Sequence, residues 1–170
     1  MGETTEATAH PVDTRKAAGR RILRFESIDE LMAEVDRLAG AERAGRLKRL
    51  GNWTLGQTLG HLACWAEYSY TGTPLEVPFF LRWLLRLRKR KFLYEPMRAG
   101  VRIPGVAGGT LANEPRSLDD GLNRLWRVME RLKAEAPSRS HPMFGLLKHD
   151  EWIAIHLRHA ELHLGFLVPE

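Results

Sequence analysis

A chain of 170 residues with 44% hydrophobic side chains is long enough to bury one sizeable core, so we expect a single folded domain. Cys64 is the single cysteine, which excludes an intrachain disulfide framework and a cysteine-ligated zinc knuckle. No apolar stretch reaches the roughly 18 residues that span a bilayer, and the N-terminus lacks the pattern of a secretory signal. We therefore expect a cytoplasmic protein without a transmembrane segment, whose net charge of +5 permits an anionic partner.

The first part of the chain predicts a tail followed by a helix. Residues 1–21 are rich in threonine, alanine and charged side chains, which favours a flexible tail ahead of a domain over 22–170. Ser27 and Glu30 form a capping box. Apolar residues then recur at helical spacing until Gly40, where we expect the first helix to end.

A second helix follows a basic connection over 41–51, for which we expect at most a helical turn. Thr54 begins another capping box, of the Thr-x-x-Gln kind, and the helix runs to about residue 70. Gly56 and Gly60 allow the backbone of another element to approach this helix closely. His61 lies in the middle of the helix beside a core position, which makes it a candidate metal ligand.

Residues 78–93 are apolar first and strongly basic later. We interpret them as an extra short helix packed on the fold with a solvated basic end. Two sharper interpretations stay open, namely an interfacial membrane helix and an anionic-surface or nucleic-acid patch over 82–91. Nucleic acid is the less favoured partner, because no stacking platform or known motif accompanies the basic residues. Residues 94–116 are rich in glycine and proline, and this long loop either covers a site or is an inert insertion.

Ser117 begins a third clear helix that stops by Pro137. A turn-like connector follows, in which we expect His141 to be exposed. The last helix spans 150–166, and five charged or small residues form one narrow stripe that we expect to face water: Glu151, Ala154, Arg158, Glu161 and Gly165. Four amphipathic helices with long connections and no convincing strand predict an all-α protein, a four-helix bundle with an extra short helix.

The last helix carries three histidines on what should be a buried side. His159 and His163 are four residues apart, so they lie on adjacent turns with Cβ atoms roughly 5–6 Å apart. His156 and His159 are three apart and make a second possible pair, whereas His156 and His163 are separated by about 10 Å along the axis. Spacing alone modestly favours His163 over His156 as the partner of His159. Because burying imidazole without a partner is costly, we expect a shared metal ion, with His61 as third ligand.

Several short stretches together resemble the DinB-like superfamily of metal-binding four-helix bundles, and most closely a branch known only as a domain of unknown function. The matching residues are Trp53-Thr54, Gly60-His61-Leu62, His141-Pro142-Met143-Phe144-Gly145, Glu151-Trp152 and the pair His159 and His163. The resemblance implies that His61, His159 and His163 hold the metal and that His156 does not. This chain departs from the branch near its end, where members often carry a polar residue and a second histidine. The residues found there instead imply either a more apolar pocket or a site that differs in detail: Leu162, Gly165 and Phe166.

The resemblance also implies functions that spacing cannot give. Some superfamily members are similar to transferases or isomerases that use low-molecular-weight thiols, and the superfamily is prone to form homodimers. The leading hypothesis is a metal-dependent transferase or hydrolase that acts on a small molecule, with Zn, Ni or Fe as Lewis acid. Glu67 and Tyr68 are candidates to shape its pocket, and no general base is assigned. The alternative is a non-catalytic, dimeric metal-binding or stress-related interaction protein.

Overall fold

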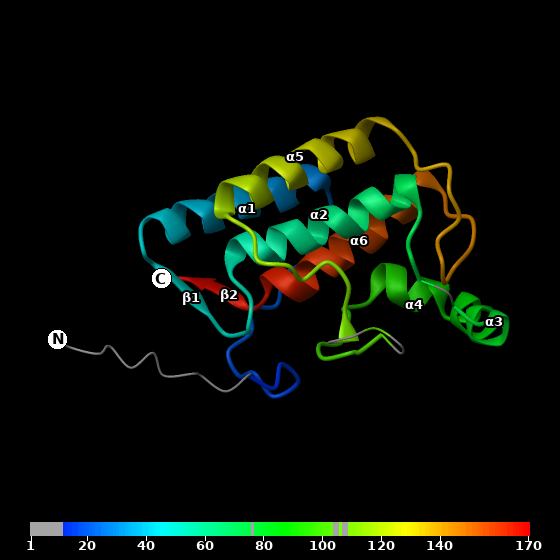
Figure 1. Ribbon diagram of the computed structural model, residues 1–170, viewed down its shortest axis with the longest axis horizontal. Helices are drawn as coiled ribbons and strands as arrows, with labels where there is room; N and C mark the ends of the chain where they lie inside the picture. Colours follow the sequence, from blue (N-terminus) through cyan, green and yellow to red (C-terminus); the bar gives the residue numbers. More distant parts are fainter. Residues whose placement is uncertain (1–11, 76, 104–105, 107–108) are drawn as a thin grey trace.

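The structure is a computed structural model that describes residues 12–75, 77–103, 106 and 109–170. Over these residues the chain is mostly helical, with six helices and one two-stranded sheet (Figure 1). The helices are α1 (Ile28–Arg43), α2 (Leu55–Thr71), α3 (Phe79–Leu87), α4 (Lys89–Tyr94), α5 (Leu118–Ala134) and α6 (His149–Leu164), and the strands are β1 (Leu47–Arg49) and β2 (Leu167–Pro169). The expectation of a helical protein is confirmed. Within the described ranges, no helix is long and apolar enough to cross a bilayer.

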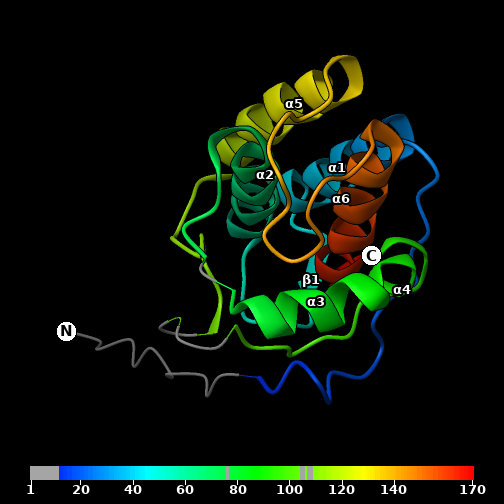
Figure 2. The same ribbon diagram turned by 90° about the vertical axis from the view of Figure 1, so that its right-hand side faces the viewer.

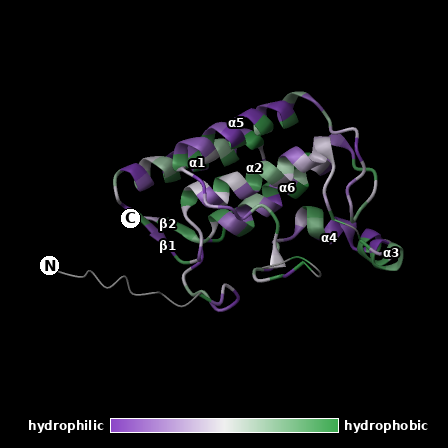
Figure 3. Ribbon diagram, viewed as in Figure 1, coloured by the Kyte–Doolittle hydropathy of each residue, from purple (hydrophilic) through white to green (hydrophobic). Residues whose placement is uncertain are grey.

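The four long helices α1, α2, α5 and α6 lie side by side around one core (Figures 1 and 2). Helix α2 packs between α5 and α6, and α1 closes the other side against the same two helices. Each long helix carries both apolar and polar residues, as Figure 3 shows by their hydropathy. The core side chains that are fully shielded from solvent are mostly leucines: Leu31, Leu38, Leu55, Leu59, Leu125, Leu132 and Leu164.

Hydroxyl side chains fix the starts of three of these helices. Ser27, Thr54 and Ser117 each accept a hydrogen bond from the backbone amide three residues further on, at 3.1 to 3.2 Å. Each such cap stabilises its helix by about 1 kcal/mol, because it satisfies an amide that has no partner within the helix. The three helix starts predicted from the sequence are confirmed, and the cap at Thr54 places His61 two turns inside α2.

Helices α2 and α5 touch backbone to backbone through two glycines. A Cβ atom at Gly56 would lie 2.5 Å from the carbonyl oxygen of Arg116, and one at Gly121 would lie 2.6 Å from the carbonyl oxygen of Gly56. No side chain fits at either separation. The predicted close approach at Gly56 is confirmed, and it fixes the distance between the helix that carries His61 and its neighbour.

The two short strands tie the end of the chain to the turn after α1. They pair antiparallel, with Leu47 opposite Pro169 and Arg49 opposite Leu167. The expectation of no strand, and of at most a helical turn over 41–51, is therefore wrong: α1 continues to Arg43 and β1 follows. Strands of three residues are too short to show an alternating pattern, and their pairing joins segments from opposite ends of the sequence.

The polar stripe expected on the last helix is partly buried. Arg158 is 2% exposed and Glu161 is 6% exposed, and the two form an ion pair of 2.6 Å. The lead-in segment before α1 covers them: the amide of Phe25 donates to Glu161 at 2.6 Å, and Arg158 donates to the carbonyl oxygen of Phe25. The expectation of a watery stripe is wrong at these two residues, because an irregular backbone segment needs polar partners and finds them here.

The described part of the predicted tail lies across the ends of α2 and α6. Its first eleven residues fall outside the described ranges. Val12 exchanges two hydrogen bonds with the Asn52 side chain, at 2.7 and 3.0 Å, and the amide of Arg21 donates to the carbonyl oxygen of Gly165 at 2.9 Å. The division into a tail over 1–21 and a domain over 22–170 stays a prediction.

The buried ion pair makes a prediction about stability. In Arg158→Met the carboxylate of Glu161 loses its cation while it remains buried, and we expect the free energy of unfolding at pH 7 to fall by about 3–5 kcal/mol. Adding Glu161→Gln should restore part of the loss, because the amide carries no charge and its oxygen can still accept from Phe25. Urea unfolding of both variants measures this; a double variant less stable than Arg158→Met would contradict the account.

Candidate metal centre

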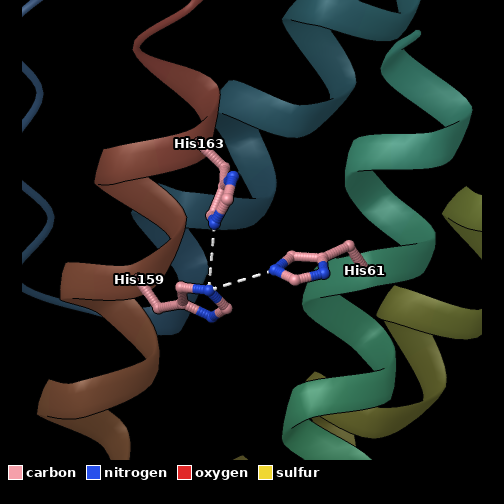
Figure 4. A group of neighbouring side chains, drawn as sticks. All are labelled: His61, His159 and His163. Atoms are coloured by element: carbon pink, nitrogen blue, oxygen red, sulfur yellow. Dashed lines mark hydrogen bonds between the residues drawn. The ribbon is translucent and has the colours of Figure 1, made fainter. Parts of the chain in front are cut away.

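Helices α2 and α6 bring three histidines to one point, as Figure 4 shows. The Nε2 atom of His159 lies 3.2 Å from Nε2 of His61 and 3.0 Å from Nε2 of His163. One ring nitrogen from each residue lies within 4.8 Å of the others, so the three histidines can hold one metal ion. The two on α6 stand on adjacent turns, and His61 faces them from α2. The structure thus brings together the three residues that sequence analysis selected.

The donor set fits a divalent metal ion. Imidazole nitrogens bind zinc at about 2.0–2.1 Å, so two ligands at a tetrahedral angle lie about 3.3 Å apart. The two short separations at His159 are close to this value. Moreover, Nε2 of His159 carries either one hydrogen or one lone pair, so it cannot make a good hydrogen bond to both neighbours at once. A shared cation would satisfy all three nitrogens together.

The loop before α5 sets the tautomer of His61. Nδ1 of His61 lies 3.0 Å from the carbonyl oxygen of Leu111. Because a carbonyl can only accept, Nδ1 must carry the hydrogen and donate it. The neutral ring then has its lone pair on Nε2, the atom that faces His159. A hydrogen bond of this kind orients histidine ligands in metal sites.

Burial keeps the three imidazoles neutral. Desolvation lowers the pKa of His61 to about 4, and hydrogen bonding to the backbone opposes it only in part. Burial also lowers the pKa of His159 and of His163 well below the usual range, and repulsion from neighbouring histidines adds to the effect. Neutral imidazole is the form that binds metal. The triad of His61, His159 and His163 can therefore accept a cation at neutral pH without releasing protons.

A cavity of about 580 Å³ opens over the triad. Two indole rings shape its inner end: Trp53 stacks on His163 with ring centroids 5.3 Å apart, and Trp65 meets His159 edge-on at 5.8 Å. Trp65 was not predicted as part of the site, although it follows His61 by four residues and therefore shares its helix face. Leu162 and Phe166, which depart from the pattern of the resembled branch, also line the cavity.

The outer wall of the cavity is positively charged. It is formed by residues 12–15 and by the described part of the loop after α4, which supply the side chains of Arg15, Arg98 and Arg102. Among the described lining residues, Asp13 is the one acid, and it pairs with Arg15 at 2.9 Å. The loop over 94–116, for which sequence analysis left two interpretations, therefore contributes to the site.

The other buried histidines have partners elsewhere. His156 lies one turn below the triad, where Nε2 is 2.8 Å from the hydroxyl of Ser69 and the ring stacks on Trp152. His163, and not His156, is therefore the neighbour of His159 at the triad. The expectation that His141 is exposed is wrong: it is 8% exposed, and its Nδ1 accepts hydrogen bonds from two amides of its own turn.

Neither candidate pocket residue on α2 faces the site. Glu67 is bound to Arg124 of α5, with Nε to Oε1 at 2.8 Å. A hydrogen bond with Cys64, together with burial, raises the pKa of the Tyr68 phenol to about 12. Neither belongs to the described residues that line the cavity, so these two expectations are wrong. Tyr68 lies two helical turns, about 10 Å, beyond His61, and Trp65 is the aromatic residue of α2 whose ring meets His61 and His159.

The fold and the site together define a mostly helical protein with three histidines that can hold a metal ion between two of its long helices. A family model matches residues 17–170, and the chain belongs to that family, DUF1569, a family of proteins of unknown function. Comparison with curated proteins and with solved structures found no match.

The buried histidines outside the triad make the fold sensitive to acid. Burial lowers the pKa of His156 to about 4 and that of His141 to about 3, against about 6.5 in the unfolded chain. Between about pH 6.5 and 4 the unfolded chain binds protons that the folded chain refuses. The stabilisation from keeping these two histidines neutral is therefore fully present above pH 6.5. The free energy of unfolding falls as the pH drops towards 4, by up to about 3 kcal/mol for His156.

The measurement is the free energy of unfolding of chelator-treated protein from pH 8 to pH 4.5. His156→Gln keeps a partner for Ser69 but cannot titrate, so its stability should fall less steeply with acid than that of the wild type. Parallel curves for the two proteins would show that His156 does not titrate as described.

Proposed function

We propose that this protein is a metal-dependent enzyme, a transferase or hydrolase, that acts on a small molecule. In this proposal His61, His159 and His163 hold one divalent ion, with Zn, Ni and Fe as the candidates that suit imidazole. The observation that carries the proposal is the convergence of three neutral imidazole nitrogens at the inner end of a cavity of about 580 Å³. A structural site usually fills every position around the metal with protein ligands, whereas three ligands leave room for a substrate.

The residues around the triad support a reaction centre more than a structural one. When bound, the ion would supply Lewis-acid chemistry. The carbonyl of Leu111 orients His61 from outside, while Trp53 and Trp65 pack against the histidine rings. His159 and His163 are only partly buried, so a ligand in the cavity can reach them. A cavity of this volume suits a small molecule.

The charge of the outer wall narrows the kind of substrate. Arg15 is engaged by Asp13, whereas Arg98 and Arg102 have no carboxylate partner among the described residues. We therefore propose that the substrate carries an anionic group, such as a carboxylate or phosphate, that Arg98 and Arg102 bind at the outer end of the cavity. Its apolar part would lie against the indoles near the triad.

We further propose that the four long helices form a DinB-like four-helix bundle. The stretches on which the resemblance rests support this, because Trp53, His61 and the pair on α6 meet at the triad. A low-molecular-weight thiol as cosubstrate and a homodimeric state follow from the resemblance alone, and both are part of the proposal. Light scattering on the purified protein tests the second of them.

Metal content tests the site. We expect protein purified without added metal to contain about one divalent ion per chain by elemental analysis, and His61→Ala, His159→Ala and His163→Ala each to lose at least tenfold in metal affinity. His156→Gln, a buried histidine one turn away, is the matched control and should keep its metal. Full metal retention in His159→Ala and His163→Ala would refute the assignment.

Loss of metal from the triad variants, without turnover of thiol or hydrolysable substrates by the wild type, would instead favour the non-catalytic alternative. In that case chelation should lower the melting temperature and nothing more.

Arg98 and Arg102 predict affinity for anions at the outer end of the cavity. We expect Arg98→Gln and Arg102→Gln each to weaken binding of an anionic small molecule by about 10- to 100-fold, since a hydrogen bond to a charged group contributes about 1.5–3 kcal/mol. Titration calorimetry of the metal-loaded protein with benzoate, phenyl phosphate and neutral benzamide measures this. Arg127→Gln on the outside of α5 is the control. Equal affinity of the wild type for benzoate and benzamide would contradict the proposal.

A further inference from the structure

Helix α3 carries its large apolar side chains outward. Phe79 is 83% exposed, Trp83 65% and Leu87 67%, with Phe80 and Leu84 at 64% and 47%. No residue of α3 is buried, although seven of its nine residues are apolar. Single exposed apolar residues are common on protein surfaces, but a contiguous group of this size marks a surface that meets another apolar phase.

The exposed residues form one continuous face. At about 100° per residue, the five of them occupy an arc of about 140° around the helix. Leu81 and Leu85 point the other way and are partly buried, so they attach α3 to the rest of the protein. Figure 2 shows α3 on the outside of the fold, next to α4 and apart from the four long helices. Because Leu81 and Leu85 attach the opposite side of α3 to the protein, its apolar face points outward.

Arginines border the apolar face on both sides. On the same projection Arg82 and Arg86 lie at one edge and Arg88 at the other. Residues 77–94 contain six arginines and lysines and no acidic residue. The guanidinium of Arg86 lies against Gly145, whose neighbour Leu146 is 78% exposed.

We propose that α3 is a docking helix for the anionic surface of a lipid bilayer. Its aromatic and leucine side chains would enter the boundary between headgroups and acyl chains, while the bordering arginines reach the lipid phosphates. Trp83 lies within the apolar arc, and tryptophan favours the membrane interface. Each basic residue near an anionic surface adds about 1 kcal/mol of attraction. The surface is independent of the histidine site.

Charge separates this occupant from the two others that such a face could take. A second copy of the chain, packed about a two-fold axis, would place the arginine edges of the two α3 helices beside each other, and like charges oppose that contact. A nucleic acid would match the arginines but leave the five apolar side chains in water. Of these three occupants, an anionic lipid surface is the one that matches both the apolar arc and its basic borders.

Vesicle sedimentation tests the proposal with the full chain. We expect the wild type to bind vesicles of 3:1 phosphatidylcholine and phosphatidylglycerol, and to bind pure phosphatidylcholine vesicles at least tenfold more weakly. Phe79→Ser combined with Trp83→Ser should reduce binding to the anionic vesicles at least tenfold, and Arg82→Gln with Arg88→Gln should reduce it several-fold in low salt. Ile22→Ser removes an apolar residue that is 96% exposed elsewhere, and should bind as the wild type does.

Circular dichroism and metal content establish that each variant is folded. Absence of wild-type binding to anionic vesicles would overturn the proposal. So would anionic-vesicle binding that survives Phe79→Ser with Trp83→Ser, since the charges would then act without insertion. A dimer by light scattering that these two substitutions dissociate would assign the face to a second copy, and DNA binding lost in Arg82→Gln with Arg88→Gln, without lipid binding, would assign it to nucleic acid.

Discussion

The packing of α2 against α6 is the contact on which the candidate site depends. His61 and His159 are separated by 98 residues in the sequence, and their ring nitrogens lie 3.2 Å apart. Nε2 of His159 lies close to Nε2 of both His61 and His163 and cannot make a good hydrogen bond to both, whereas a shared cation would satisfy all three nitrogens. The close glycine contact at Gly56 sets α2 against α5, while the covering of α6 by the segment around Phe25 holds that helix on its other side.

The long connection between α2 and α5 contributes to both the candidate metal site and the exposed apolar surface. Helices α2 and α6 carry the three histidines, but this connection supplies the carbonyl of Leu111 that orients His61, and it supplies Arg98 and Arg102 of the outer cavity wall. The same connection contains α3, whose apolar face points away from the core. One segment of the chain thus carries both the proposed substrate-binding arginines and the proposed membrane-docking helix.

Charge plays three different roles in the molecule. Arg158 and Glu161 are buried together, and their side chains complete the hydrogen bonds of the Phe25 amide and carbonyl. Arg98 and Arg102 line a cavity and are suited to an anion of small size. The arginines of α3 border an apolar face and are suited to an extended anionic surface. A net charge of +5 describes none of these roles, because each depends on what surrounds the side chain.

The sequence by itself determined the helical character, the starts of three long helices and the selection of His61, His159 and His163. Caps and helical periodicity are local features, and they can be read over a few residues. Only the tertiary structure decided that Ser69 takes His156, that Glu161 is buried, and that two three-residue strands pair. Those outcomes depend on partners from distant parts of the chain, because a buried polar group is stable only where another segment completes its hydrogen bonds.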